Sequence, residues 1–326
     1  MISILIAARN EAHNIINCLQ SIENLTYPKD QLEVWIGDDE SSDSTYGLVE
    51  NFIAHKPYFN LLQITSDWGQ ARGKANVLAQ LAAAARGDYF LITDADVAVP
   101  PHWVQTMMAA LQPGVGIVTG VTVPKANTAW MALQALDWVH ALSVINQLAR
   151  WRIPVTTMGN NMLVTRAAYE ATGGYENMPF SITEDYQLFR QVLTLKYGFR
   201  QIYSPDAVAL TLPMPNLSAW LHQRKRWTYG ALQSAWFIKL ILFSPLIIAP
   251  LLIGLSIIQP WWTLLLGLGY ILIQASVIAR GIHRLRLGYL YPYLWLYPFY
   301  FHFSAFATVI YYYLPTKTVW KGRVYE

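Results

Sequence analysis

The stretch YFLITDAD, from Tyr89 to Asp96, is an apolar run that ends at two carboxylates. Such a continuous apolar run is typical of a strand that is buried on both faces of a parallel sheet. The same unit recurs twice upstream, where the runs Ser3 to Ala8 and Leu32 to Gly37 end at Arg9 and at Asp38-Asp39. These units predict strands whose carboxyl ends carry charged side chains.

Helical patterns fill the intervals between these strands, and the run Leu61 to Thr65 adds another strand before a helix from Lys74 to Arg86. This alternation predicts an α/β domain with a mainly parallel sheet flanked by helices. Ligands bind beyond the carboxyl ends of the strands in such sheets. The charged residues that follow the strands are therefore expected at one edge: Arg9, Asp38, Asp39, Asp94 and Asp96.

Composition separates a polar part from an apolar part. Hydrophobic residues make up 54% of the 326 residues and charged residues only 13%, whereas soluble domains carry about a quarter charged residues. No Asp or Glu occurs from Leu240 to Pro315. We expect a polar domain over residues 1–230 and a membrane region over residues 231–326.

Two stretches, Leu240 to Ile258 and Trp261 to Ala279, are long enough to cross a hydrocarbon core of ~30 Å. The basic loop Arg280 to Arg286 follows them, and the positive-inside rule places it in the cytoplasm, on the side expected for the polar domain. The segment Tyr289 to Leu314 is expected as one kinked span or a re-entrant hairpin. A single span would put the basic tail outside, against the same rule, so both arrangements stay open. We expect a multi-pass membrane protein.

Several classes of function are disfavoured. A net charge of +3 without a basic stripe argues against nucleic acid as a partner. The single cysteine, Cys18, excludes a disulfide framework and a cysteine zinc site, and its apolar helical surroundings predict a buried thiol. A transporter would need ionisable groups in its spans, and residues 240–279 contain none. Nothing in the sequence indicates an oligomeric state.

Two segments rich in tryptophan, Thr128 to Trp151 and Leu217 to Leu240, have helical patterns with few charges. Amphipathic helices of this kind lie well in a bilayer interface. Packing in a protein core is the alternative, and for Thr128 to Trp151 the sequence does not decide between the two.

Four motifs occur in a fixed order: Asp38-Asp39, Asp94-Ala95-Asp96, Thr183-Glu184-Asp185, and Gln223 with Arg226-Trp227. This D, DxD, TED, QxxRW series resembles the family 2 glycosyltransferases. The resemblance is to the membrane-bound branch related to cellulose, hyaluronan and ceramide glucosyl transferases, and it covers roughly residues 1–230. Its specificity lies in the ordered set, because each motif alone is weak. It implies a GT-A-like domain that moves a sugar from a nucleotide-diphosphate sugar, in this branch a UDP-sugar, with inversion.

The resemblance assigns Asp38 and Asp39 to the nucleotide end of the donor, although Asp43 in the same segment fits a helix cap. Arg9, which follows the first strand, is expected to bind substrate at the same edge. Lys74, after Gly73, would offer a charge to phosphate, the alternative being a solvated lysine at a helix start.

Asp94 and Asp96 would hold Mn²⁺ or Mg²⁺, because these cations take one or two carboxylates plus substrate phosphates. A DxD tripeptide also arises often by chance. Its position after a buried strand and between the other motifs favours the metal.

In the TED motif the resemblance makes Asp185 the base that takes the acceptor proton, with Glu184 orienting or capping. The competing interpretation is that Thr183 and the two acids form an ordinary helix start. Nearby turns, at Gly159-Asn160-Asn161-Met162 and Gly173-Gly174-Tyr175, are expected to shape the pocket.

In the QxxRW motif Arg226 would neutralise the leaving diphosphate, Trp227 would offer an apolar face to a sugar, and Gln223 is expected to bind substrate beside them. The alternative is a basic helix resting on anionic lipid, for which Arg224 and Lys225 are the candidates.

We therefore expect an inverting glycosyltransferase, a hexosyltransferase, with a lipid or lipid-linked acceptor. A processive polysaccharide synthase subunit is the alternative, although two to four C-terminal spans are few for a polymer channel. A non-catalytic scaffold would be expected to lack at least one carboxylate, and none is missing.

Overall fold

The computed structural model describes residues 1–316, 318–320 and 323–325. The chain forms two compact units. The first comprises Met1–Val123 and Thr156–Leu212, and the second comprises Pro124–Val155 and Pro213–Glu326.

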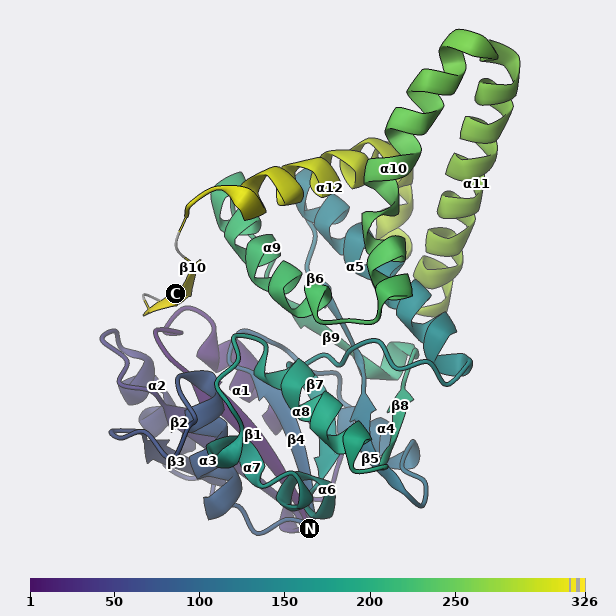
Figure 1. The fold of residues 1–326 in the computed structure, drawn as a ribbon. Coiled ribbons are helices and arrows are strands. Elements are labelled where there is room, and N and C mark those ends of the chain that lie inside the picture. The colour runs from purple at the N-terminus through teal and green to yellow at the C-terminus, as the bar shows by residue number, and fades with distance from the viewer. Residues whose placement is uncertain (317, 321–322, 326) are drawn as a thin grey trace. The chain divides into compact units, whose positions relative to one another are not determined.

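A seven-stranded sheet forms the centre of the first unit, with the strand order β3-β2-β1-β4-β7-β5-β8 (Figure 1). Its strands are β1 (Ile2–Ala8), β2 (Leu32–Asp38), β3 (Phe59–Gln63), β4 (Tyr89–Asp94), β5 (Val115–Thr119), β7 (Asn161–Thr165) and β8 (Gly198–Gln201). The pairs β1/β2, β1/β4, β2/β3 and β5/β8 are parallel, and β7 runs antiparallel to both of its neighbours. The predicted α/β fold with a mainly parallel sheet is confirmed.

Helices cover both faces of this sheet. They are α1 (Ile15–Glu23), α2 (Thr45–Ile53), α3 (Lys74–Ala84), α4 (Trp103–Ala109), α6 (Arg166–Ala171), α7 (Gly174–Asn177) and α8 (Glu184–Thr194), with the short 3₁₀ helices η1 (Lys29–Gln31) and η2 (Pro205–Ala207). A separate two-stranded sheet pairs β6 (Val121–Pro124) with β9 (Val208–Thr211).

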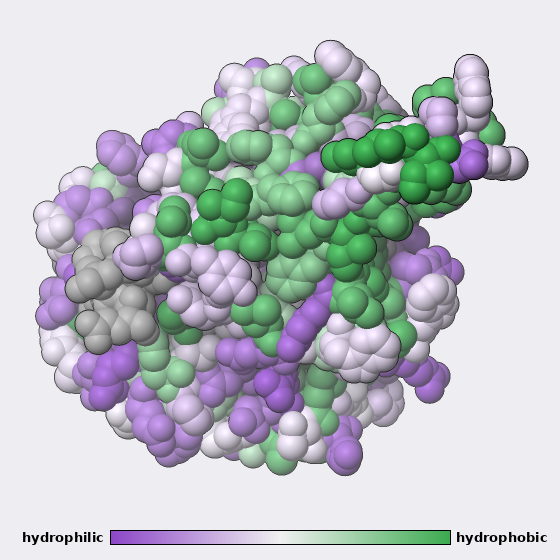
Figure 2. Space-filling view, turned by 45° about the horizontal axis from the view of Figure 1, so that its top comes forward, coloured by the Kyte–Doolittle hydropathy of each residue, from purple (hydrophilic) through white to green (hydrophobic). Residues whose placement is uncertain are grey.

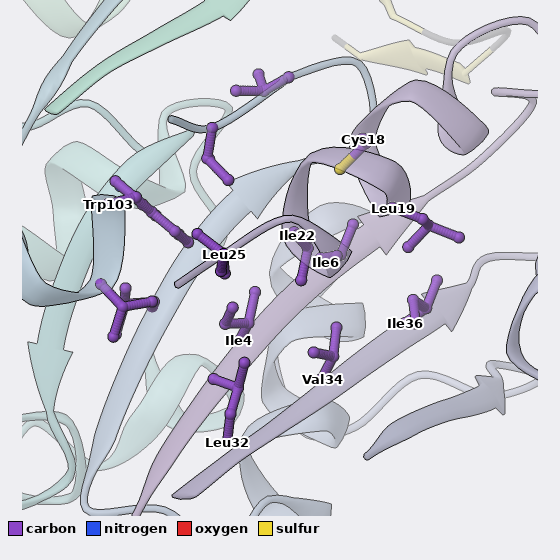
Figure 3. Close-up of a cluster of buried hydrophobic side chains, with 14 of the residues drawn as sticks. Ile4, Ile6, Cys18, Leu19, Ile22, Leu25, Leu32, Val34, Ile36 and Trp103 are labelled. Carbon is purple, nitrogen blue, oxygen red and sulfur yellow. The ribbon is translucent and has the colours of Figure 1, made fainter. Parts of the chain in front are cut away.

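Alternate residues of the central strands enter two different cores, as the unbroken apolar runs predicted. Ile4 and Ile6 pack on one face with Leu19 of α1 (Figure 3). Leu5 lies on the other face, in the core that includes most of α3. Cys18 is fully buried in the first core, which confirms its predicted burial.

The order of the strands brings the charged strand ends together. Asp38 and Asp94 lie at the ends of β2 and β4, which flank β1 and pair there with Ala8 and Ala7. Because the chain leaves β1 towards β2 on one side and returns to β4 on the other, this is the topological switch point where α/β sheets bind ligands. The reversed strand β7 begins at the same edge, opposite Thr93, so the loop before β7 joins that edge.

The second unit is helical. Its elements are α5 (Ala129–Arg150), α9 (Leu217–Leu232), α10 (Trp236–Ile258), α11 (Pro260–Arg284), η3 (Gly288–Leu296), α12 (Tyr297–Tyr313), β10 (Thr318–Trp320) and β11 (Arg323–Tyr325). Within the described part of the chain, α10 and α11 are the helices long and apolar enough to cross a membrane, with mean hydropathies of 2.5 and 1.8. They fall on the first two expected spans.

The contacts divide the chain differently from the expected boundary at residue 230. Helices α5 and α9 belong to the unit that holds α10, α11 and α12. Within this unit, Asp137 of α5 forms an ion pair with Arg224 of α9. The expected helix from Leu217 to Leu240 is also interrupted, since α9 ends at Leu232 and α10 begins at Trp236.

Candidate active site

The ends of β1 and β2 form the first part of the site. The carboxylates of Asp38 and Asp39 are buried, with 2% and 5% of each residue exposed. Asp38 Oδ2 accepts a hydrogen bond from the Ser41 N–H at 3.2 Å, while Oδ1 is buried without a partner among the described residues. Arg9 donates to the main-chain oxygen of Asp39, and its Nη1 lies 3.6 Å from Asp39 Oδ2. A buried acceptor without a donor costs free energy unless a ligand supplies the donor.

The two loops after these strands fix each other. Asn10 has a left-handed backbone, with φ of 53°, and its Oδ1 accepts a hydrogen bond from the Ser42 N–H at 2.8 Å. Asp43 accepts from the N–H groups of Ala12 at 3.1 Å and Thr45 at 3.0 Å. Asp43 therefore ties the start of α2 to the first loop, which agrees with the capping role predicted for it. Asn10 was not singled out from the sequence, and its exposed polar side chain gave no signal there.

Lys74 connects the DxD and TED motifs. It is the first residue of α3, after Gly73, whose φ of 56° is one that glycine adopts readily. Lys74 Nζ lies 2.5 Å from Asp94 Oδ1 and 3.2 Å from Glu184 Oε1. The interpretation of Lys74 as a solvated lysine is therefore wrong, because its side chain is mostly buried between two carboxylates.

Asp185 is held by main-chain donors. Its Oδ2 accepts a hydrogen bond from the Gly159 N–H at 2.8 Å, and its Oδ1 accepts from the Tyr186 N–H at 2.8 Å. The approach to Gly159 is close, since a Cβ at that position would lie 2.6 Å from Asp185 Cβ and 2.7 Å from Asp185 Oδ2. Gly159 therefore determines where the Asp185 carboxylate sits. Thr183 precedes α8 without a side-chain cap, so side-chain capping does not account for the motif.

The two acids of the TED motif differ in their surroundings. Burial, and next the charge of Glu184, raise the pKa of Asp185 to about 6. Burial alone would lower the pKa of Lys74, but the charges of Asp94 and Glu184 outweigh burial and hold it above its ordinary value. Lys74 thus stays charged beside Glu184, while Asp185 is the carboxylate with increased proton affinity. An ionised carboxylate of this kind is suited to accept a proton near neutral pH.

Acidic side chains outnumber basic side chains at this edge of the sheet. Six carboxylates gather at these strand ends and at the start of α8, with Arg9 and Lys74 as cations beside them. They are Asp38, Asp39, Asp94, Asp96, Glu184 and Asp185. No group of three or more potential protein ligands to a metal occurs among the described residues. Mg²⁺ is usually bound by one or two carboxylates, and phosphate oxygens and water fill its other coordination positions. The carboxylates of Asp94 and Asp96 therefore fit a divalent cation that binds together with a diphosphate.

A buried asparagine supports this edge. Asn161, at the start of β7, accepts from the Trp103 indole N–H at 2.8 Å and donates to the main-chain oxygens of Val121 and Ala207. The hydroxyl of Thr93, next to Asp94, donates to the main-chain oxygen of Asn160 at 3.0 Å. These bonds hold the Gly159 loop beside β4. In the sequence this segment was read only as a turn that shapes the pocket.

The QxxRW residues lie on α9 in the second unit. Trp227 packs edge to face on Trp138 of α5, with ring centroids 5.1 Å apart. Arg224 and Lys225 lie inside the motif, between Gln223 and Arg226. Arg224 pairs with Asp137. Lys225 is buried and donates hydrogen bonds to the main-chain oxygens of Leu314 and Thr316. The interpretation of Arg224 and Lys225 as lipid-facing cations is therefore wrong, because both hold helices of their own unit together. Gln223 and Arg226 are partly exposed on the same helix.

Comparison with known proteins identifies the family. Residues 3–326 match the sequence model of the family described as Glycosyl transferase family 21. The chain belongs to this family. The predicted resemblance to glycosyltransferases is thereby confirmed, and with it the assignment of the chain to a family of transferase enzymes.

Curated relatives of the family 21 chain have related names. The chain is 29% identical over 235 residues to the probable glycosyltransferase YdaM of Bacillus subtilis (strain 168), and the match covers 70% of this chain and 54% of the relative. It is 30% identical over 245 residues to a beta-monoglucosyldiacylglycerol synthase of Trichormus variabilis, covering 71% of this chain and 49% of the relative. The chain thus spans about half the length of these two relatives. An N-acetylglucosaminyltransferase of Rhizobium meliloti is 26% identical over 324 residues, covering 88% of this chain and 74% of the relative.

A solved structure shares the fold. The mannosyltransferase PcManGT of Pyrobaculum calidifontis, in complex with GDP-Man and Mn²⁺, superposes with a TM-score of 0.60 at 20% identity. The superposition covers 97% of this chain and 88% of that one. At this identity the likeness concerns the fold, and it confirms the GT-A-like architecture that was predicted.

Proposed function

We propose that this family 21 chain transfers a sugar from a nucleotide-diphosphate sugar, of the UDP-sugar class that its motifs imply, to the hydroxyl of a lipid or lipid-linked acceptor. The observation that carries the proposal is Asp185, a carboxylate of raised pKa held by the Gly159 and Tyr186 N–H groups at the switch point of the sheet. Family membership and the name of the Trichormus relative support the reaction and the acceptor.

The reaction that we derive has one proton transfer. The acceptor hydroxyl gives its proton to Asp185 while its oxygen forms a bond to the anomeric carbon. The bond from that carbon to the diphosphate oxygen breaks on the opposite side, and the nucleoside diphosphate leaves with the electron pair. Glu184 is not the base in this scheme, because its carboxylate already pairs with the Lys74 ammonium at 3.2 Å.

Asp38 and Asp39 are proposed to hold the nucleoside. The unpartnered Oδ1 of Asp38 is a ready acceptor for a ribose hydroxyl or a base N–H. Arg9 fixes the main chain of Asp39 and orients this pair.

The diphosphate is proposed to lie over Asp94, Asp96 and Lys74. An anion cannot bind among six carboxylates unless cations offset them, and Lys74 supplies one positive charge. A bound Mn²⁺ or Mg²⁺ would supply Lewis-acid stabilisation of the leaving diphosphate, and Asp94 and Asp96 would hold it. By the family resemblance we assign Gln223, Arg226 and Trp227 to the leaving group and the sugar.

The enzyme is proposed to work as a multi-pass membrane protein, with the catalytic unit on the cytoplasmic face. The apolar helices α10 and α11 support the membrane location. The exposed basic residues at the end of α11 and beyond, Arg280, Arg284 and Arg286, support the orientation.

A processive polysaccharide synthase remains the second candidate, because the QxxRW motif of Gln223, Arg226 and Trp227 also resembles that of such synthases. The two candidates differ in product. A lipid transferase yields a lipid that carries one added sugar, whereas a synthase yields a ladder of increasing length.

The test is to incubate the protein in lipid nanodiscs with Mn²⁺, a panel of radiolabelled nucleotide sugars and a lipid extract, and to separate the products by chromatography. We expect radioactivity in a single organic-soluble glycolipid with one UDP-sugar. Label that appears only in water-soluble polymer would favour the synthase. Absence of label in any product, from protein shown to be folded, would contradict the proposal.

A further inference from the structure

Helix α12 (Tyr297–Tyr313) falls in the segment that was expected to form one kinked span or a re-entrant hairpin. We propose that α12 instead lies in the plane of the bilayer interface, with one face on protein and the other in lipid, so that among the described helices only α10 and α11 cross the membrane. The inference rests on the membrane location in the proposed function, but not on the reaction.

The N-terminal end of α12 is fixed to α5. The Tyr297 hydroxyl donates to Asp137 Oδ1 at 2.9 Å and lies 3.0 Å from His140 Nδ1. Asp137 also pairs with Arg224 of α9. Tyr297 is fully buried in this polar cluster, so this end of the helix is anchored to charged and polar groups rather than to lipid.

The C-terminal end of α12 is fixed to α9. Lys225 Nζ donates to the main-chain oxygens of Leu314 at 2.8 Å and Thr316 at 2.9 Å, just past the end of the helix. A cation at this position also complements the helix dipole. One turn earlier, the Tyr311 hydroxyl lies 3.0 Å from His222 Nε2 of α9. Both ends of α12 are therefore held by α5 and α9, and Figure 1 shows α12 running over these helices and away from the direction of the α10–α11 hairpin.

The opposite face of α12 is apolar and exposed. Its residues recur every three or four positions, which places them on one side of a helix. They are Trp295 just before the helix, then Phe299, Phe303, Phe306, Ile310 and Tyr313. We call this set the aromatic stripe. Figure 2 shows hydrophobic side chains gathered over the middle of the molecular face in view.

A bilayer interface suits the aromatic stripe better than a protein partner. Aromatic residues are enriched where membrane meets water, and the stripe belongs to the same unit as the apolar helices α10 and α11. The sequence of this unit holds 13 Lys and Arg residues against two acids, Asp137 and Glu326. Such an excess of positive charge is attracted to anionic headgroups. The 17 residues of α12 span only about 26 Å as a helix, which is less than the ~30 Å core.

The inference has a consequence for topology. With α12 in the interface, the segment after it lies on the same side of the membrane as the loop after α11. The basic tail then obeys the positive-inside rule, which a third span would break.

The first experiment measures depth in nanodiscs. Single cysteines at Phe299, Phe306 and Tyr313 are labelled with an environment-sensitive fluorophore, and lipids with a nitroxide near the headgroup or deep in the chain are compared as quenchers. Cys18 is buried and stays unlabelled, so the unaltered protein is the background. Leu272, exposed near the middle of α11, is the control for a deep position.

We expect the shallow quencher to act most strongly at all three positions of α12, and the deep quencher at Leu272. Deepest quenching at Phe306 with shallow quenching at Phe299 and Tyr313 would show a spanning helix and overturn the inference. Protection of all three from both quenchers would show that protein, such as a second copy of the chain, covers the stripe.

The second experiment uses an impermeant maleimide on intact cells, with single cysteines at three exposed positions: Gln259 in the α10–α11 turn, His283 at the end of α11, and Pro315 after α12. Pro315→Cys should behave like His283→Cys and opposite to Gln259→Cys. Labelling of Pro315→Cys together with Gln259→Cys would refute the inference. Labelling of His283→Cys and Pro315→Cys alone would reverse the proposed orientation yet uphold an in-plane α12.

Discussion

Replacing Gly159 by alanine tests whether the close approach to Asp185 positions the base. The added Cβ would lie 2.6 Å from Asp185 Cβ and 2.7 Å from Oδ2. An ordinary contact between carbon atoms is about 3.5 to 4.0 Å, so the carboxylate must move by roughly 1 Å. A displacement of that size at a reacting group can lower a rate by about 100-fold. Crowding of this kind costs about 1 to 3 kcal/mol of stability.

We expect Gly159→Ala to lower turnover by about 100-fold while the affinity for nucleoside diphosphate stays close to that of the unaltered enzyme, because Asp38 and Asp39 lie on other loops. The assay is the rate of glycolipid formation in nanodiscs, beside calorimetric titration with the nucleotide and a thermal melt. Gly47→Ala in α2 is the matched control, since nothing lies within 4 Å of its added Cβ. Normal turnover by a folded Gly159→Ala enzyme would refute the reasoning.

Three further predictions concern metal, pH and stability. Turnover should require Mn²⁺ or Mg²⁺, and full activity in excess chelator would exclude this requirement. Asp96→Asn should weaken metal-supported nucleotide binding without lowering the melting temperature. Because the pKa of Asp185 is raised to about 6, kcat/KM should fall below that pH as the base becomes protonated, and a flat profile down to pH 5 would argue against Asp185. Burial would raise the pKa of Glu33, but hydrogen bonds from the Ser3 hydroxyl and the Arg86 N–H hold it below its ordinary value. Its folded-state pKa is thus lower than its unfolded one, so its stabilisation is present near neutrality and lost as the pH falls through the folded value. Glu33→Gln should cost about 1 to 2 kcal/mol at pH 7, and the difference should shrink in acid; a constant difference across pH would contradict this.

The sheet and its charged edge could be predicted because they depend on local patterns. A strand buried on both faces reads as an unbroken apolar run, and the residue after it falls at the ligand-binding edge whatever the partner strands are. Asp38 and Asp94 were placed in this way, and the register of β1 with β2 and β4 brings them to one edge.

Long-range pairings could not be predicted from one sequence. Gly159 approaches Asp185 across 26 residues, and Arg224 reaches Asp137 across 87. A glycine in a polar loop looks like a turn, and two cations on an amphipathic helix look like lipid contacts. Only the fold shows that this glycine admits a carboxylate and that Arg224 and Lys225 have internal partners.

The segment before β7 illustrates the same limit in the fold. Asn161 occurs in a run that was read only as a turn, yet it begins a strand antiparallel to β4. The strand pairs antiparallel with both β4 and β5, and local periodicity does not encode pairing with strands so distant in sequence.

The most direct test of the central claim is the turnover of Asp185→Asn. Asparagine keeps the shape and can still accept one of the two main-chain hydrogen bonds, but it cannot take the proton. The single-turnover rate of sugar transfer should fall by about 100- to 10,000-fold, while binding of nucleotide and metal and the melting temperature change little. Glu184→Gln and the Gly47→Ala control are measured beside it. A rate for Asp185→Asn close to that of the unaltered enzyme, or a larger loss for Glu184→Gln with folding intact, would contradict the assignment of Asp185 as the base.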